Sequence, residues 1–235
     1  MSTPCIVLAG GLGMRLRGVV PDLPKCLAPI AGRPFLEWQL SSLAERGVEH
    51  FVLALGHSAD NVLETLRQPW ALRLSIDTVI ERELLGTGGA ARFAMNETGL
   101  NEAVIANGDT FLGGSLEPML TPLDLERGEL MRIATVRVPD RKRFGGVAVD
   151  VEQRVTAFLE KGHTGAGLIN AGLYRIHRHA FDCEAQGAFS IETQVMPRLV
   201  ANGVLQAREL AGPFIDIGVP DDYHLFATRV HYYVR

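Results

Sequence analysis

The chain has 235 residues, of which 47% are hydrophobic and 21% are charged, and its formal net charge at pH 7 is −4. This composition is typical of a globular protein, and the acidic balance argues against a general binder of nucleic acid or of anionic membranes. No run of about 18 apolar residues occurs, and no basic segment with a cleavage site precedes Cys5–Ala9, so we expect a cytoplasmic protein without a membrane span or signal peptide. The three cysteines include no C-x-x-C pair, which argues against a disulfide framework.

The first half of the chain alternates short apolar runs with longer segments of helical period. We expect strands at Cys5–Ala9, Phe51–Gly56, Leu74–Ile80 and Ala103–Ala106, and helices at Pro34–Arg46, Ser58–Leu66 and Gly88–Met95. Pro34 and Gly47 are typical of a helix start and a helix end. Strands that alternate with helices of this length predict βαβ units and a parallel sheet.

The pattern changes after residue 110. Here we expect strands at Ile133–Val138, Val147–Val151, Val155–Leu159, Ile169–Ile176, Val204–Leu210 and Phe214–Ile217, and helices at Ile191–Ala201 and from Pro220 onward. The short turns between several of these strands indicate an antiparallel or mixed region. No internal repeat or Pro/Ser linker divides the chain, so the sequence predicts a single α/β domain with a Rossmann-like, mostly parallel mixed sheet and helices on both faces.

A glycine-rich loop follows the first expected strand, in the sequence Leu8-Ala9-Gly10-Gly11-Leu12-Gly13-Met14-Arg15-Leu16. Open α/β sheets bind ligands at the carboxyl ends of their strands, and glycines there let backbone N–H groups approach phosphates closely. Arg15 adds a fork of donors suited to phosphate oxygens, and Lys25 adds a point charge on a proline-braced segment. The loop therefore predicts a phosphate-binding site.

Other interpretations of this loop match the sequence less well. A dinucleotide-binding fingerprint requires a glycine where Leu16 stands and a helix that starts at once, and a Walker A loop requires Gly-Lys-Ser/Thr. The sequence has neither. A glycine-rich turn without a ligand remains an alternative, but the presence of Arg15 and Lys25 favours phosphate binding.

Two aspartates stand at the ends of expected strands. Asp109 follows Ala103–Ala106 and emerges beside the glycine loop, and Asp216 is an isolated acid in the apolar stretch Phe214–Val219. A carboxylate in apolar surroundings is costly unless a metal or cation compensates it, and Mg²⁺ prefers one or two carboxylates together with phosphates and water. Asp109 as a turn residue and Asp216 as a hydrogen-bonded structural acid remain alternatives, but together the two predict a Mg²⁺ site.

The motif L-A-G-G-x-G-x-R-L followed by P-K resembles the signature of the sugar-1-phosphate nucleotidyltransferases, and the resemblance recurs in order along nearly the whole chain. It implies a GT-A-like fold in which residues 1–110 bind a nucleoside triphosphate and residues 111–235 bind a sugar 1-phosphate. It also implies transfer of a nucleoside monophosphate to the sugar phosphate with release of pyrophosphate.

The resemblance assigns roles residue by residue. The implied catalytic residues are Arg15, Lys25, Asp109 and Asp216, with Asp109 and Asp216 as the Mg²⁺ ligands. The implied nucleotide-binding residues are Leu8, Ala9, Gly10, Gly11, Gly13, Glu81, Gly86, Thr87, Gly88, Asn107 and Gly108. The implied sugar-phosphate-binding residues are Gly145, Glu160, Lys161 and Asn170.

The stretch Glu81–Ala90 resembles the base-reading loop of this family, although guanylyl-transferring members often carry a proline where Leu84 stands. A carboxylate can accept both N1–H and N2–H of guanine, whereas uracil and thymine suit an amide. Glu81 or Glu83 therefore favours GTP, and the alternative is that both glutamates only solvate a loop.

Three further stretches, Leu168–Tyr174, Phe189–Glu192 and Phe214–Tyr223, resemble the members that act on D-glycero-α-D-manno-heptose 1-phosphate. Guanylyl transfer to mannose 1-phosphate, uridylyl transfer to an N-acylated sugar 1-phosphate and a non-catalytic sugar-nucleotide-sensing subunit remain alternatives. The complete set of implied catalytic residues disfavours the sensing subunit. Tyr223–Tyr233 carries enough apolar surface to join a homo-oligomer interface, or else it caps the sheet.

Overall fold

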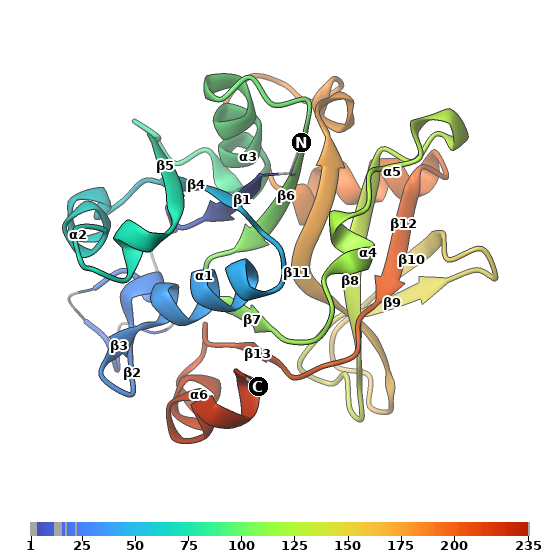
Figure 1. Ribbon diagram of the computed structural model, residues 1–235. Coiled ribbons are helices and arrows are strands. Elements are labelled where there is room, and N and C mark those ends of the chain that lie inside the picture. The colour runs from blue at the N-terminus through green and yellow to red at the C-terminus, as the bar shows by residue number, and fades with distance from the viewer. Residues whose placement is uncertain (1–3, 12–15, 17, 22, 235) are drawn as a thin grey trace.

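The computed structural model describes residues 4–11, 16, 18–21 and 23–234 (Figure 1). Within them, a nine-stranded mixed sheet has the order β10-β9-β11-β6-β1-β4-β5, and β8 pairs with both β11 and β12. Its strands are β1 (Cys5–Leu8), β4 (His50–Leu55), β5 (Ser75–Ile80), β6 (Glu102–Asn107), β8 (Met131–Val138), β9 (Gly146–Val149), β10 (Val155–Leu159), β11 (Gly167–His177) and β12 (Leu205–Glu209). The mixed α/β sheet expected from the sequence is confirmed.

The first half of the sheet is parallel and the second half introduces antiparallel pairs. Strand β1 pairs in parallel with β4 and β6, and β4 pairs in parallel with β5. Strand β11 runs antiparallel to β6, with Leu173 opposite Ala106, and antiparallel to β8. The change of pattern that the sequence shows after residue 110 is therefore the change from parallel to antiparallel pairing.

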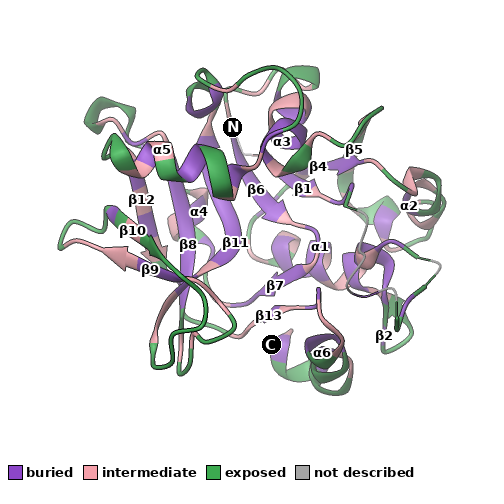
Figure 2. Cartoon of the chain, turned by 180° about the vertical axis from the view of Figure 1, so that it is seen from behind, coloured by how far each residue is buried: buried purple, intermediate pink, exposed green. Residues whose placement is uncertain are grey.

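The helices are α1 (Phe35–Glu45), α2 (Ala59–Thr65), α3 (Gly86–Glu97), α4 (Glu117–Leu120), α5 (Met196–Ala201) and α6 (Pro220–Tyr233). Helices α1 and α3 cover opposite faces of the parallel half, whereas α4 packs on β8 and β11 and α5 packs on β10 and β12. Successive side chains of β1 point to opposite faces: Cys5 and Val7 join the core that contains Leu40 of α1, and Ile6 joins the core that contains Ala91 of α3. Figure 2 shows these central strands buried. A strand that is apolar on both faces needs such a cover on each side.

Three short strands that the sequence did not predict complete the fold: β2 (Pro29–Ile30), β3 (Arg33–Pro34) and β7 (Thr110–Leu112). Strand β2 pairs with β3, and β7 pairs antiparallel with β13 (Phe214–Asp216), which lies within the expected strand Phe214–Ile217. The expected helix Ile191–Ala201 is instead a π-helical turn at Ile191–Val195 followed by α5. Pro197 lies in the first turn of α5 and has no N–H to donate, so a continuous α-helical ladder cannot run through it.

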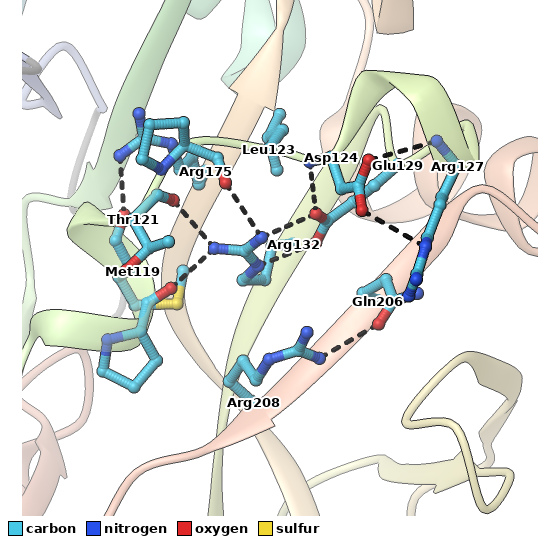
Figure 3. Close-up of polar contacts among 12 residues, drawn as sticks. Met119, Thr121, Leu123, Asp124, Arg127, Glu129, Arg132, Arg175, Gln206 and Arg208 are labelled. Carbon is cyan, nitrogen blue, oxygen red and sulfur yellow. Dashed lines mark hydrogen bonds and ion pairs between the residues drawn. The ribbon is translucent and has the colours of Figure 1, made fainter.

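A cluster of buried arginines fastens α4 and its neighbouring loops to the sheet (Figure 3). Arg132 of β8 forms an ion pair with Glu129 at 2.6 Å, and its guanidinium also donates to the carbonyl oxygens of Pro118 and Thr121. Arg175 of β11 pairs with Glu102 and donates to the carbonyl oxygens of Met119 and Leu120. Arg132, Arg175 and Glu129 are buried and Glu102 is partly buried, and each of these charges has an opposite charge beside it, as a structural role requires.

No helix in the described part of the chain is long and apolar enough to cross a membrane.

Candidate functional site

A cavity of about 380 Å³ opens at the carboxyl ends of β1 and β6. This volume lies in the range of small-molecule sites, and the carboxyl edge of a parallel sheet is where such folds bind ligands. The described residues that line it are Leu8, Ala9, Gly10, Gly11, Lys25, Cys26, Glu81, Leu84, Gly86, Thr87, Ala90, Asn107, Gly108 and Asp109. The structure thus brings most of the predicted nucleotide-binding residues to one place.

Two predicted nucleotide-binding residues do not appear among these. Gly88 lies in the first turn of α3, where it donates its N–H to the carbonyl of Phe189 at 3.0 Å, and a Cβ there would collide with the Phe189 ring. Gly88 therefore packs α3 against the segment around Phe189. Gly13, like the predicted catalytic residue Arg15, lies outside the described residues.

Two of the glycines that line the cavity, Gly10 and Gly108, have no room for side chains. A Cβ on Gly108 would lie 2.5 Å from the carbonyl oxygen of Leu8, so only glycine lets the end of β6 lie this close to β1. A Cβ on Gly10 would collide with the Glu81 carboxylate. The Glu81 carboxylate, just after β5, therefore lies directly against the backbone of the first loop.

Asp216 lies beside Lys25 and Asp109, two of the residues that line the cavity. Lys25 begins a short helical turn after the buried Pro24, and its Nζ atom lies 2.6 Å from Asp109 Oδ2. Asp216 comes to the same place because β13 pairs with β7 and the Ile217 N–H donates to the Asp109 carbonyl at 2.9 Å. A Cβ on Gly218 would lie 2.7 Å from Asp216 Oδ1 and 3.3 Å from both Asp109 Oδ2 and Lys25 Nζ. The absence of a side chain at Gly218 keeps open the small space that these charges share.

This arrangement fits Mg²⁺ bound with a substrate better than a metal held by protein alone. In the described residues, no group of three or more His, Cys, Asp or Glu side chains is arranged to hold a metal ion. Two carboxylates from different strands next to a glycine-lined phosphate loop match the preference of Mg²⁺ for one or two carboxylates plus phosphate oxygens. The Lys25–Asp109 pair shows that Asp109 attracts a cation.

Glu81 faces the cavity at the end of β5 and is half-buried. Its Oε2 atom accepts a hydrogen bond from the Leu85 N–H at 2.9 Å, which fixes the carboxylate over the glycine loop. Burial raises the pKa of Glu81 above its ordinary value, and the Leu85 hydrogen bond lowers it in part. Glu83 is exposed and is not one of the lining residues. The structure therefore separates the two glutamates that the sequence left equivalent.

The predicted sugar-phosphate residues lie outside the cavity lining, around the pairing of β9 with β10 and β11. Gly145 precedes β9, and a Cβ there would lie 2.9 Å from the carbonyl oxygen of Leu159, the last residue of β10. Glu160 and Lys161 follow directly and are exposed. Asn170 of β11 follows the residue that pairs with Gly146 of β9. These four residues thus come together at one end of the sheet.

Sequence reasoning missed several residues at the site. Cys26, Leu84 and Ala90 line the cavity, and burial raises the pKa of the Cys26 thiol to about 12, so Cys26 is an apolar wall and not a nucleophile. Arg143 forms a two-point ion pair with Asp222 at 2.6 and 2.9 Å. Its only signal in the sequence is its place just before Phe144-Gly145.

Comparisons with known proteins agree with this geometry. The family model described as "Nucleotidyl transferase" matches residues 5–231. The chain is 35% identical to D-glycero-alpha-D-manno-heptose 1-phosphate guanylyltransferase of Aneurinibacillus thermoaerophilus, over 97% of this chain and 99% of that protein. It is 36% identical to mannose-1-phosphate guanylyltransferase of Mycobacterium tuberculosis, over 93% of this chain but only 62% of that protein.

A solved structure matches the whole fold. The crystal structure of HddC from Yersinia pseudotuberculosis complexed with GMP-PN has a TM-score of 0.84 and 31% sequence identity, and the match covers 97% of this chain and 99% of that one. With a family model that spans nearly the full length and relatives of more than 30% identity, the chain belongs to the nucleotidyl transferase family.

Proposed function

We propose that this enzyme transfers GMP from GTP to D-glycero-α-D-manno-heptose 1-phosphate, giving the GDP-sugar and pyrophosphate. One observation carries the proposal: a glycine-lined cavity has Lys25, Asp109 and Glu81 among its lining residues, and Asp216 lies beside Lys25 and Asp109. The sequence similarity to a heptose 1-phosphate guanylyltransferase, which extends over nearly the full length of both chains, supports the choice of sugar.

Catalysis rests on positioning and charge, as in other phosphoryl transfers. The sugar phosphate is already an anion, so its oxygen attacks the α-phosphorus without a general base. Lys25 stabilises the charge on the α-phosphate and the leaving oxygens, and we assign Arg15 to the departing pyrophosphate. The backbone N–H groups around Gly10 and Gly11 face the phosphates.

Asp109 and Asp216 are the residues that would hold Mg²⁺ together with the triphosphate. The ion supplies charge neutralisation on the reacting phosphates. Lys25 balances the charge of Asp109 through their 2.6 Å contact.

The base and the sugar bind on opposite sides of this centre. Glu81 accepts N1–H and N2–H of guanine, a pair of donors that uracil and thymine lack. In the second half of the chain, the Gly145 backbone, Glu160 and Asn170 bind the sugar, and Lys161 binds its phosphate. Residues 1–110 thus form the nucleotide half, and residues 111–235 form the sugar-phosphate half.

Mannose 1-phosphate is the second candidate acceptor, because the mannose-1-phosphate guanylyltransferase of Mycobacterium tuberculosis is equally similar over the part that matches. The chain spans 62% of that relative's length. Uridylyl transfer to an N-acylated sugar phosphate is disfavoured by the carboxylate, rather than an amide, at position 81.

A matrix of four nucleoside triphosphates against heptose, mannose, glucose and N-acetylhexosamine 1-phosphates tests the proposal. Pyrophosphate release is measured with Mg²⁺ and with EDTA. We expect the highest kcat/KM for GTP with the heptose phosphate, and no release without the metal ion. Faster turnover of UTP, or of any other sugar phosphate, would overturn the corresponding half of the proposal.

A further inference from the structure

A carboxylate surrounded by hydroxyl groups lies between the two halves of the site. Glu192 sits half-buried in the π-helical turn Ile191–Val195. Its Oε2 atom accepts hydrogen bonds from the Thr87 hydroxyl at 2.6 Å and the Ser190 hydroxyl at 2.9 Å. Its Oε1 atom accepts one from the Tyr174 hydroxyl at 3.2 Å. Three donors from three different segments of the chain therefore converge on one side chain.

The carboxylate fixes the direction of these hydrogen bonds. An ionised carboxylate only accepts, so each hydroxyl points its proton at Glu192 and offers its lone pairs elsewhere. The Thr87 oxygen accepts from the Ile191 N–H at 3.0 Å. The Tyr174 oxygen accepts from the Asn170 amide nitrogen at 3.1 Å. Burial raises the pKa of Tyr174 well above its ordinary value and the Glu192 charge raises it further, so the hydroxyl keeps the proton that it donates.

The same chain of hydrogen bonds sets the orientation of the Asn170 amide. Its oxygen accepts from the Gly172 N–H at 3.0 Å, and one of its two N–H groups donates to Tyr174. The second N–H is the group that remains for a sugar hydroxyl. If the Tyr174 hydroxyl turned its proton toward Asn170, the amide would have to flip and would lose the contact with Gly172.

The segment that carries Glu192 is held firmly against the nucleotide half. The Phe189 N–H donates to the Leu85 carbonyl at 2.9 Å, and the Phe189 carbonyl accepts from the Gly88 N–H at 3.0 Å. Thr87, which lines the cavity, lies between these contacts. Glu192 is thus tied to the start of α3 on one side and to β11 on the other.

We propose that Glu192 is a positioning residue for the acceptor substrate: through the Tyr174 hydroxyl it holds the Asn170 amide in the orientation that binds a sugar hydroxyl. This inference rests on the proposed function and adds a residue to which that function assigns no role. Glu192 acts through its neighbours and does not itself touch the reacting phosphates.

The substitution Glu192→Gln has an asymmetric expected effect. Two hydroxyls donate to the Oε2 position and only one to the Oε1 position. A glutamine therefore keeps its oxygen toward Thr87 and Ser190 and turns its NH₂ group toward Tyr174. The Tyr174 proton must then point toward Asn170, so the disturbance falls on the sugar side and leaves the nucleotide side in place.

The experiment is steady-state kinetics of Glu192→Gln with each substrate varied in turn. We expect the KM for the sugar 1-phosphate to rise roughly tenfold, as for the loss of one well-oriented hydrogen bond to substrate, while the KM for GTP stays within about twofold. The matched control is Glu184→Gln, eight positions earlier in the chain. Its carboxylate pairs with Arg198 at 3.0 Å, and neither residue is among those that line the cavity. This control should leave both KM values unchanged.

Tyr174→Phe provides a second route to the same result. Removal of the hydroxyl interrupts the hydrogen-bond chain from Glu192 to Asn170, so the KM for the sugar phosphate should rise as it does in Glu192→Gln. In the double variant this KM should be no higher than in Tyr174→Phe alone.

An unchanged sugar-phosphate KM in a folded Glu192→Gln or Tyr174→Phe enzyme, or equal rises in KM for both substrates, would overturn the inference. A wild-type chain that releases no pyrophosphate with any sugar phosphate would instead refute the proposed function, and the inference with it.

Discussion

Two groups of charged residues lie on the same sheet and differ in how their charges are used. Around Arg132 and Arg175, each buried guanidinium contacts a carboxylate and backbone carbonyls that close around it. At the carboxyl end of β1 and β6, Lys25 and Asp109 contact each other but border an open cavity of about 380 Å³. Both arrangements reduce the cost of charge in a protein interior, but only the second leaves space for another molecule.

The difference shows how to separate structural charges from functional ones in this fold. A structural charge has its partners supplied by the chain itself, and its loss should lower stability. A functional charge is held in place by backbone geometry, such as the glycines at 108 and 218, and faces a space that no side chain fills. Its loss should lower activity with little change in stability.

The largest expected effect is on stability, in the buried arginine cluster. Arg132→Ala leaves Glu129 buried without its partner, which should lower the free energy of unfolding by about 3–5 kcal/mol. Urea denaturation measures this change. Arg137→Ala on the same strand is the control, because its pair with Glu209 is exposed to solvent and should contribute little to the free energy of unfolding. Equal losses in both variants would remove the distinction between the two kinds of charge.

The next effect is on turnover at the cavity. Lys25→Ala should lower kcat by on the order of 10² to 10³, because a preorganised charge near the transferred phosphate is lost. Its midpoint of thermal unfolding should stay near that of the wild type. Lys142→Ala, at an exposed lysine outside the cavity lining, should leave kcat unchanged. Near-normal turnover in a folded Lys25→Ala enzyme would show that this lysine is not catalytic.

Gly218→Ala should place one methyl group in the space between Asp216, Asp109 and Lys25. The new Cβ would crowd Asp216 Oδ1 at 2.7 Å and also approach Asp109 and Lys25. We expect kcat/KM to fall by about 10² and the concentration of Mg²⁺ needed for half-maximal rate to rise. Gly18→Ala, where no atom of the described residues lies within 4 Å of the added Cβ, serves as control. An unchanged Mg²⁺ requirement would place the ion elsewhere.

The smallest expected effect concerns the recognition of guanine by Glu81 and the pH dependence of kcat/KM for GTP. Because burial raises the pKa of Glu81, the carboxylate takes up a proton at a higher pH than an ordinary glutamate, and the protonated form cannot accept both guanine donors. The kcat/KM for GTP should therefore fall as the pH decreases through this raised pKa. Glu81→Gln should lower kcat/KM for GTP by about tenfold at neutral pH and abolish this part of the pH profile. A profile that keeps its acid limb in Glu81→Gln would assign it to another group.

The sequence predicted the fold well where a signal is local. Strand β10 begins and ends at the expected residues, Val155 and Leu159, and the two-sided apolar run after Glu102 is the central strand β6. The short pair of β7 and β13 was not expected as a sheet, because three-residue strands carry little periodicity. The π-helical turn at Ile191–Val195 was also missed, since it follows the same hydrophobic spacing as a helix.

The site was predictable in its parts but not in its connections. The glycine motif, Lys25 and the two aspartates carry chemistry that can be read from residue types. The roles of Glu81 and Glu192 depend on which neighbours face them, and these neighbours come from distant segments. The Thr87–Glu192 contact spans 105 positions in the chain, a pairing that no local pattern specifies.

The most direct test of the central claim is a count of bound Mn²⁺, as a spectroscopic substitute for Mg²⁺, by electron paramagnetic resonance in the presence of GTP. Both ions take oxygen ligands. If Asp109 and Asp216 hold one ion together beside the glycine loop, the wild type binds a single tight Mn²⁺ that Asp109→Asn and Asp216→Asn each lose, while the exposed control Asp221→Asn retains it. Tight Mn²⁺ binding that survives in either aspartate variant would contradict the account.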